Sequence, residues 1–198
     1  MPVLMLAQKK AVTETGDEVL LYDDGTWKYI SNAVSDKVEI VTNPQAFKKS
    51  SAAGFLLKSG KFNIGVWLDA KKWSFGKANN NEEAEYEMQL KGKDLYAMLI
   101  TEKIEIPLET LKTIAIENGR KAAPDLQVIK QEYRTVNNMK VLLLQMNGST
   151  KGIKFSYLGY YFSSANGTVQ FVTYTAQNLL SSLREDAEQL LNGLVTIE

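Results

Sequence analysis

The residues of this chain that are best suited to chemistry are a short run of glutamates, Glu82, Glu83, Glu85 and Glu87. Carboxylates at this spacing could bind a cation or act as a general acid and base. Strand alternation places Glu85 and Glu87 on the same face, but the sequence supplies no second acidic group opposite them. Charged residues also commonly protect the exposed edge of a sheet. We therefore interpret the run as a solvated strand edge, and expect no catalytic residue and no metal ligand.

Two residue types that perform much of protein chemistry, cysteine and histidine, are both missing from the 198 residues. Their absence excludes a disulfide, a thiol nucleophile, a Cys/His zinc site and a Ser-His-Asp triad within the chain. The charges balance, with 23 basic and 23 acidic residues, whereas nucleic-acid-binding domains usually carry a basic excess. The composition thus favours a non-enzymatic protein with no cofactor and no nucleic-acid partner.

Aromatic side chains form the second group of candidates. Tyr157, Tyr160, Tyr161 and Phe162 lie in one β-rich stretch, and Trp73 stands apart from them. Tyrosine and tryptophan are enriched at binding hot spots, so Trp73, Tyr160 and Tyr161 make up the candidate binding surface. Strand alternation, however, places Tyr157 and Tyr161 on one face and Tyr160 and Phe162 on the other. Aromatic residues at strand spacing usually pack, which favours the alternative that both sets belong to the core.

The element that must position these tyrosines is the aromatic hairpin, residues 152–176. Two aromatic and β-branched runs flank Ala165-Asn166-Gly167-Thr168, and Asn-Gly is a strong signal for a tight hairpin turn. A second pair, Asn147-Gly148, predicts another turn just before this hairpin. Both pairs also match the glycosylation sequon, but hairpin turns explain them without a sugar.

The elements around the aromatic hairpin are two helices and further strands. The first helix opens at Pro107, because proline suits the first helical position. The last helix is amphipathic, and Ser182 and Glu185 have the spacing of a capping box at its start. Period-two alternation predicts strands near residues 62–68 and 85–90. Residues 95–104 are apolar on both faces and predict a more central strand, and residues 126–134 and 139–146 predict a hairpin around Asn137-Asn138. Short turns join antiparallel neighbours, so we expect an α+β fold, an antiparallel sheet with helices packed on its faces.

Three shorter segments precede this domain. Residues 1–7 are apolar and end abruptly at polar residues, which resembles the tail of a secretory signal peptide, although Met5 is larger than the cleavage site prefers. The alternative is a short buried strand. Residues 8–30 predict an N-terminal β-meander, in which Asp23-Asp24-Gly25 indicates a turn rather than a calcium loop. Residues 31–60 predict a linker with short elements, including a short helix over 44–53.

Several landmarks between residues 61 and 197 occur together in one known family. They are Phe62-x-Ile64 followed by Trp73, a helix after a central strand, the Tyr-Tyr-Phe hairpin, and a closing helix after Thr173-x-Thr175. On these landmarks the segment resembles the PsbP-like superfamily, which includes the extrinsic oxygen-evolving protein of photosystem II, Mog-type import factors and DcrB-like bacterial secreted proteins. The resemblance implies an antiparallel sheet sandwiched by helices over residues 61–198. It also implies binding of partner proteins, and it carries over no functional residue.

These observations leave three functional hypotheses. The leading one is an exported, non-enzymatic bacterial protein, periplasmic or extracellular, that binds an envelope or secreted protein. The alternative is a binder of a small molecule or glycan in an aromatic cleft around Trp73 and Tyr160. The third is a hydrolase run by carboxylates, for which no paired constellation is visible. A flat, exposed apolar patch would favour the protein partner, and a concave pocket with converging polar groups would favour the ligand.

Overall fold

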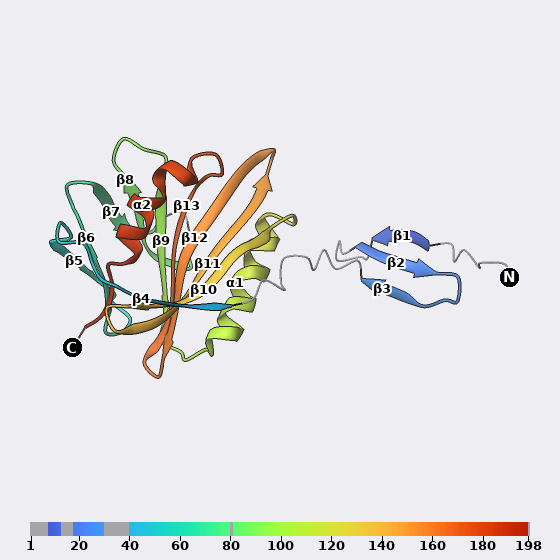
Figure 1. Cartoon of the computed structure of the whole chain (residues 1–198), viewed down its shortest axis with the longest axis horizontal. Helices are drawn as coiled ribbons and strands as arrows, with labels where there is room; N and C mark the ends of the chain where they lie inside the picture. Colours follow the sequence, from blue (N-terminus) through green and yellow to red (C-terminus); the bar gives the residue numbers. More distant parts are fainter. Residues whose placement is uncertain (1–7, 13–17, 30–39, 80, 198) are drawn as a thin grey trace. The chain divides into compact units, whose positions relative to one another are not determined.

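In the computed structural model the chain divides into two compact units, Met1–Val38 and Glu39–Glu198 (Figure 1). The structure describes residues 8–12, 18–29, 40–79 and 81–197. The signal-peptide interpretation of residues 1–7 therefore lies outside the described residues. The boundary after Val38 comes well before residue 61, where the main domain was expected to begin.

The first unit is a three-stranded antiparallel meander in the order β1-β2-β3. Its strands are β1 (Gln8–Val12), β2 (Glu18–Tyr22) and β3 (Trp27–Tyr29). In the turn between β2 and β3, Asp24 Oδ1 accepts hydrogen bonds from the Thr26 N–H at 2.8 Å and the Thr26 hydroxyl at 2.6 Å. Gly25 completes this turn with a φ of +79°, which glycine adopts without strain. The predicted meander is confirmed, and the Asp-Asp-Gly motif is a turn.

An eight-stranded sheet organises the second unit, in the order β4-β10-β11-β12-β13-β9-β8-β7. Its strands are β4 (Val41–Phe47), β7 (Trp73–Lys77), β8 (Ala84–Leu90), β9 (Tyr96–Glu102), β10 (Gln127–Val136), β11 (Met139–Thr150), β12 (Ile153–Ser164) and β13 (Gly167–Ala176). All neighbouring pairs are antiparallel except β4 and β10, which run parallel. The α+β class is confirmed, and the parallel pair at the edge makes the sheet mixed rather than purely antiparallel.

The aromatic hairpin is the pair β12 and β13 near the middle of this sheet, and it turns within the predicted segment 165–168. The turn predicted at Asn147-Gly148 is wrong, because β11 continues through it. The chain reverses instead at Lys151-Gly152, whose φ values of +48° and +79° are those of a type I′ hairpin turn. Gly148 allows β11 to pack closely against the residue that follows α1, since a Cβ at position 148 would lie 3.1 Å from the Ala123 Cβ.

Strand β4 forms one edge of the large sheet and lies within the segment expected to be a linker. It pairs only with β10. The helix expected over residues 44–53 does not form, and Pro44 lies within the strand. An edge position tolerates a residue that has no N–H to donate. The domain start was misplaced because β4 lacks the apolar alternation by which more central strands are recognised.

Two helices and a small sheet complete the second unit. The small sheet, in the order β14-β6-β5, consists of β5 (Phe55–Lys58), β6 (Ile64–Leu68) and β14 (Leu194–Thr196). Helix α1 (Leu108–Ala122) follows Pro107, and helix α2 (Leu180–Leu191) follows the aromatic hairpin. The predicted capping box is wrong, because the Ser182 hydroxyl lies inside α2 and donates to the Leu179 carbonyl at 2.9 Å. Within the described residues, no helix is long and apolar enough to cross a membrane.

The two helices pack on opposite faces of the large sheet. On the α2 face, α2 and the small sheet cover residues such as Leu158, Tyr160 and Phe171. On the α1 face, α1 packs against residues such as Leu144 and Tyr161. Because a strand points successive side chains to opposite faces, neighbouring residues of the aromatic hairpin have different surroundings.

Candidate functional site

Tyr160 belongs to the α2 face, and 0% of its surface is exposed. Its hydroxyl donates to Asn192 Oδ1 at 2.8 Å and accepts a hydrogen bond from Arg134 Nη1 at 3.0 Å. Burial raises the pKa of Tyr160 to about 12, so the hydroxyl keeps its proton at neutral pH. Both hydrogen-bonding roles of this group are used within the protein. Tyr160 is a structural residue here, which corrects its assignment to a candidate binding surface.

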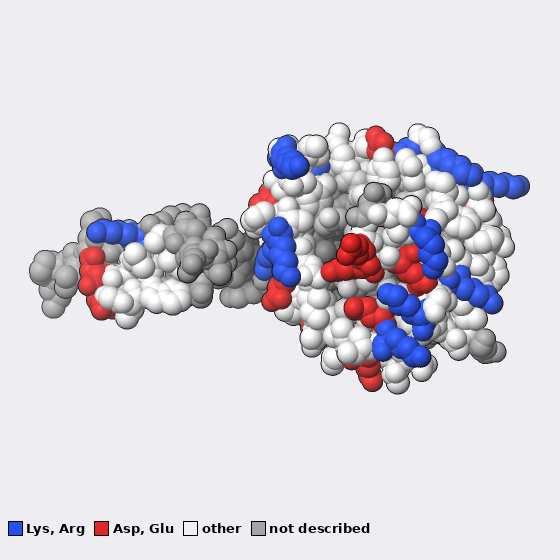
Figure 2. All heavy atoms as spheres, turned by 180° about the vertical axis from the view of Figure 1, so that it is seen from behind, with Lys and Arg blue, Asp and Glu red and all other residues white. Residues whose placement is uncertain are grey.

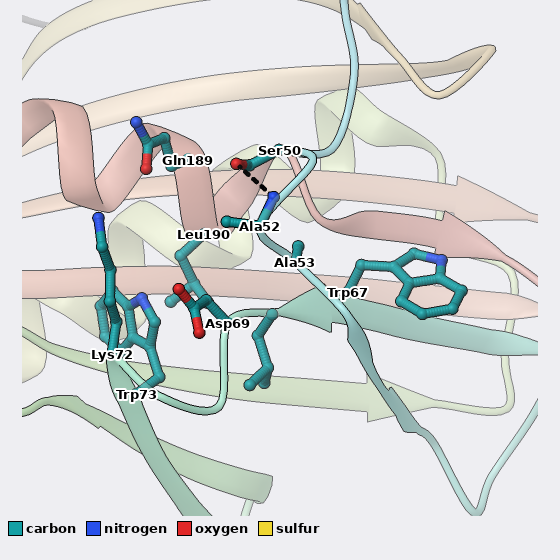
Figure 3. Close-up of a pocket in the computed structure, with 10 residues that line it drawn as sticks. Ser50, Ala52, Ala53, Trp67, Asp69, Lys72, Trp73, Gln189 and Leu190 are labelled. Atoms are coloured by element: carbon teal, nitrogen blue, oxygen red, sulfur yellow. Dashed lines mark hydrogen bonds between the residues drawn. The ribbon is translucent and has the colours of Figure 1, made fainter.

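Trp73 is also buried, with 4% of its surface exposed. It lies beside a small pocket lined by Ser50 and Ala53 from the segment before β5, by Asp69, and by Leu190 of α2 (Figure 3). This pocket has a volume of about 20 Å³, close to the space that a single water molecule needs. An organic ligand does not fit such a space. Trp73 and Tyr160 are both buried, so the described part of the chain does not expose them in the aromatic cleft that was expected.

The third candidate, Tyr161, lies at a larger cavity on the opposite face. This cavity, which we call the α1 groove, has a volume of about 180 Å³. Strands β9, β11, β12 and β13 form its floor, α1 forms one wall, and the segment before β8 forms its rim. Its described lining residues are Asn81, Glu83, Met98, Ile100, Ala115, Asn118, Gly119, Ala122, Met146, Tyr157, Tyr161, Gln170 and Val172. The structure thus contains a concave site, at a place other than the one predicted.

Helix α1 leaves space for the groove because small residues line it on the helix side. Leu111 anchors the helix to the sheet and has no exposed surface. Further along, Ala115, Gly119 and Ala122 line the groove, and spacings of four and three residues place them on one face of the helix. Gly119 is also constrained to be small, since a Cβ there would lie 3.0 Å from Leu126 Cδ2. The groove is therefore the space that larger side chains at these positions would fill.

Two tyrosine hydroxyls at the groove have no hydrogen-bond partner among the described residues. Tyr161 has 2% of its surface exposed, and burial raises the pKa of its hydroxyl well above the ordinary value. Burial also raises the pKa of Tyr157. Tyr157 is only partly buried. Buried polar groups in proteins are nearly always hydrogen-bonded, so the deeply buried Tyr161 hydroxyl calls for an explanation. A polar group of a bound molecule would provide one.

A row of aromatic rings continues from the groove across three strands. Tyr96 and Tyr174 stack with their ring centroids 5.4 Å apart, and Tyr174 meets Tyr157 edge to face at 6.2 Å. Tyr157 also contacts Phe155, at a centroid distance of 4.8 Å. Offset and edge-to-face arrangements are the favourable ones for such pairs. The row therefore holds the Tyr157 ring in a fixed orientation beside the groove.

The charged group that lines the groove is acidic. Glu83 is exposed at the rim, Asn81 and Asn118 also line the groove, and no lysine or arginine is among the described lining residues. A second carboxylate acts on the aromatic row, since the pKa of Tyr174 is raised by burial and by the negative charge of Glu87. These carboxylates make the outer part of the groove unfavourable for an anion.

The glutamate run is only partly the solvated edge that was expected. Glu85 is 8% exposed and accepts hydrogen bonds from Ser59 Oγ, Thr101 Oγ1 and the Gly60 N–H, each at 2.6 Å, and from Lys77 Nζ at 3.3 Å. Burial opposes the charged form of Glu85, but these hydrogen bonds outweigh it and hold its pKa below the usual value. Glu85 fastens the loop between β5 and β6 to β8 and β9, so the expectation of a solvated side chain is wrong for this residue.

The other acidic residues of the run show no metal-binding geometry. Glu82 and Glu83 are exposed, and in the described part of the chain no cluster of three or more acidic side chains could hold a metal ion. Figure 2 shows the molecule from behind the view of Figure 1, with basic and acidic side chains interspersed on the second unit. This face does not carry the basic stripe that a nucleic acid would need.

Sequence reasoning named Tyr161 but missed most of its neighbours. Alternation already separated Tyr161 from Tyr160 and joined it to Tyr157, and that pattern was the available signal. The small residues 115, 119 and 122 on one face of the first helix were a second signal that went unused. Nothing in the sequence indicates that Met98, from a distant strand, lies in the same groove.

Comparison with solved structures assigns the second unit to a known fold. Cyanobacterial PsbP (CyanoP) from Synechocystis sp. PCC 6803 superimposes with a TM-score of 0.56 at 12% sequence identity, over 74% of this chain and 94% of that one. LpqN of Mycobacterium tuberculosis, involved in cell envelope biogenesis, gives 0.48 at 12% identity, over 73% of this chain and 90% of that one. PA94 of Pseudomonas aeruginosa, a protein of unknown function, gives 0.47 at 13% identity, over 73% and 97%.

The likeness to CyanoP shows the fold alone, because the sequence identity is low. No family model matches the sequence, and comparison with curated proteins gives no significant match. The chain contains a PsbP-like α+β fold, as its sequence landmarks predicted.

Proposed function

We propose that this protein is a non-enzymatic binding module that receives a small, largely apolar ligand in the α1 groove. The observation that supports the proposal is Tyr161, a buried side chain whose hydroxyl has no partner among the described residues and which lines a cavity of about 180 Å³. Ligand sites are typically concave and mostly apolar, with a few polar groups that fix orientation. A ligand with one hydrogen-bonding group would satisfy the tyrosine hydroxyl.

The size of the groove limits the ligand. A cavity of about 150 Å³ accommodates benzene, whereas sites for drug-sized molecules occupy roughly 300–1,000 Å³. With about 180 Å³, the groove fits one six-membered ring with short substituents. Such a ring is either a free molecule or one group of a larger molecule that extends past the rim.

The residues of the groove suit binding better than catalysis. General acid–base catalysis needs a positioned acid or base whose pKa is adjusted to the reaction. Glu83 is the one carboxylate among the described lining residues, and it is exposed to solvent. The buried carboxylates Glu85 and Glu132 hold parts of the fold together by accepting hydrogen bonds from Ser59 and Arg134, respectively.

The proposed compartment is the bacterial cell envelope or its exterior. Export is supported by the apolar residues 1–7, which are followed by Gln8-Lys9-Lys10 in the manner of a cleaved signal peptide. N-terminal sequencing of the protein purified from its native cells tests the proposal. A mature chain that begins at Gln8 is the expected result, and a cytoplasmic chain that retains Met1 contradicts export.

The test of the groove is a screen of small ring compounds by two-dimensional ¹H–¹⁵N NMR on the full-length chain. Bound fragments are expected to shift the amide resonances of residues around the groove, such as Met98, Gly119 and Val172. Ala122→Phe introduces a large side chain at an exposed lining position and is expected to abolish these shifts. Thr113→Phe makes a large, aromatic change at an exposed position of the same helix outside the groove, and should leave the shifts intact.

Two results would contradict the proposal. One is a screen in which no ring compound shifts the groove resonances. The other is a set of fragments that bind equally to wild type and to Ala122→Phe, which would place their site elsewhere.

A second candidate function, binding of an envelope or secreted protein, is supported by the first unit. Leu21 and Trp27 are opposite each other on β2 and β3, and they are 40% and 54% exposed. Large apolar side chains exposed together often mark a protein contact. Affinity capture from the native envelope fraction tests this function. The double variant Leu21→Ser/Trp27→Ser should lose a partner that Lys9→Ser, at an exposed position of β1, retains; capture of the same proteins by both variants would contradict it.

A further inference from the structure

We infer that the α1 groove selects a hydroxylated aromatic ring that is neutral or positively charged, and that it discriminates against anions of the same shape. This inference rests on the proposed function of the groove as a ligand site. It follows from three successive parts of the groove. The buried tyrosine constrains the polar group of the ligand, the apolar walls constrain its ring, and the acidic rim constrains its charge.

The inner part of the groove requires a hydrogen-bonding group on the ligand. Tyr161 is 2% exposed, and its hydroxyl has no partner among the described residues. A hydroxyl can both donate and accept, so a ligand hydroxyl is complementary to it in either direction. A phenylalanine at position 161 would make this part of the groove wholly apolar. The tyrosine instead contributes one hydroxyl oxygen that can form a hydrogen bond with the ligand.

The walls of the groove select a flat, apolar body. Met98 and Met146 line the floor, together with Val172 and the ring of Tyr157. Thioethers and aromatic rings both make favourable contacts with an aromatic ring. The Tyr157 ring is held in place by its contacts to Phe155 and Tyr174, so this wall is preformed. A saturated sugar with hydroxyls on every carbon would leave many of its polar groups unpaired against such walls.

The outer part of the groove sets the preferred charge. Glu83 lines the rim and is the charged residue among the described lining residues. Lys121 and Arg120 do not line the groove; Lys121 Nζ is hydrogen-bonded to Asn118 Oδ1 at 3.0 Å, and Arg120 Nε donates to the Leu126 carbonyl at 3.5 Å. A ligand cation at this end is attracted by the Glu83 carboxylate, and a ligand carboxylate is repelled.

Two pairs of probes test the inference by NMR titration of the full-length chain. p-Cresol and toluene differ only in the ring hydroxyl, whereas tyramine and 4-hydroxyphenylacetate share the phenol ring and carry short substituents of opposite charge. Toluene is expected to bind about five- to tenfold more weakly than p-cresol, because one hydrogen bond is missing. Tyramine is expected to bind more tightly than 4-hydroxyphenylacetate.

Two conservative variants assign these preferences to individual residues. Tyr161→Phe should make p-cresol and toluene bind equally while leaving the preference for tyramine over 4-hydroxyphenylacetate. Glu83→Gln should reduce the preference for the cation while leaving the affinity for p-cresol. Glu82→Gln removes a neighbouring exposed charge that does not line the groove, and it serves as the control for the charge effect.

The outcomes separate this inference from the function on which it rests. Equal binding of toluene and p-cresol to wild type would overturn the hydroxyl requirement, and tighter binding of 4-hydroxyphenylacetate than of tyramine would overturn the charge preference. If all four probes fail while other ring compounds bind in the groove, the inference is wrong and the proposed function stands. If no compound binds in the groove, both are wrong.

Discussion

Tyr160 and Tyr161 are neighbours in the chain, yet they lie on opposite faces of the sheet and their hydroxyl groups have different hydrogen-bonding surroundings. On the α2 face, the Tyr160 hydroxyl is hydrogen-bonded to both Arg134 and Asn192. On the α1 face, the Tyr161 hydroxyl is just as deeply buried and has no partner among the described residues. The difference teaches that burial alone does not separate a structural tyrosine from a candidate ligand contact. What separates them is whether the protein itself completes the hydrogen bonds.

The two faces differ in the same way as a whole. The α2 face is covered by a helix and a three-stranded sheet, and its core extends through both of them. The α1 face is covered by one helix, whose small residues leave a cavity of about 180 Å³. A closely packed and fully bonded layer favours stability, whereas unfilled space and unpaired polar groups reduce it and are retained where function needs them. The α2 face is thus the more completely packed and hydrogen-bonded of the two, and the cavity lies on the α1 face.

The largest effect is expected from breaking the polar network of the α2 face at Arg134. Its side chain is 5% exposed and forms ion pairs with Glu132 and Glu188. Arg134→Met removes the buried partner of Glu132 and leaves this carboxylate with Lys130, whose side chain is 44% exposed, as its ion-pair partner among the described residues. We expect a loss of about 3 kcal/mol in the free energy of unfolding, the lower end for a broken buried pair, measured by urea denaturation. Lys93→Met, at a side chain that is 51% exposed and pairs with Asp186 away from this network, should cost at most about 1 kcal/mol. Equal losses of unfolding free energy in the two variants would show that the buried ion pairs of Arg134 contribute no more to stability than an exposed ion pair does.

The next effect tests the bonded tyrosine. Tyr160→Phe removes one hydroxyl and leaves Asn192 Oδ1 and one Arg134 N–H without a hydrogen-bond partner. Leaving buried polar groups unpaired costs about 1–3 kcal/mol, and we expect a loss of this size in thermal and urea unfolding. A neutral substitution would show that the hydroxyl is not part of the network.

A smaller effect is expected from the pH dependence of Glu85. Its pKa is lowered in the folded protein because hydrogen bonds outweigh the effect of burial. Its contribution to stability is therefore fully present above the unfolded-state pKa of about 4.3 and is lost as the pH falls through the lower folded-state value. Glu85→Gln should cost about 1–2 kcal/mol at neutral pH and progressively less toward pH 3. The measurement is the urea midpoint as a function of pH, with exposed Glu82→Gln retaining the wild-type profile.

The smallest effect on stability is expected at Tyr161, where the comparison between the faces is most direct. Tyr161→Phe removes a buried hydroxyl that has no partner among the described residues, so the free energy of unfolding should stay the same or rise by up to about 1 kcal/mol. A loss as large as that of Tyr160→Phe would mean that the protein does bond this hydroxyl, and the two faces would then be alike.

Much of this architecture could be predicted from local sequence patterns. Alternation placed Tyr160 and Tyr161 on opposite faces, and the Asn166-Gly167 signal located the aromatic hairpin. Local turn signals were less reliable where two possible turns lie close together in the sequence. The chain turns at Lys151-Gly152 and not at Asn147-Gly148, because β11 then continues through Thr150 and forms more backbone hydrogen bonds with β12.

The side-chain contacts that distinguish the two faces were not predictable in this way, because they join residues far apart in the chain. The partners of Tyr160 are Arg134 and Asn192, which are 26 and 32 residues away. The hydrogen bonds that bury Glu85 come partly from Ser59, also 26 residues away. Spacing along the sequence indicates which face a side chain joins, but not which other elements cover that face. The groove at Tyr161 depends on that missing information.

The edge strand β4 affects how readily copies of the protein can associate with one another. An exposed sheet edge offers unpaired N–H and C=O groups on which strands of other molecules can assemble. Pro44 lies within this strand at the end of the sheet, and it has no N–H to donate. The edge therefore cannot present an unbroken row of donors, which hinders the growth of fibrils from the widest sheet of the molecule.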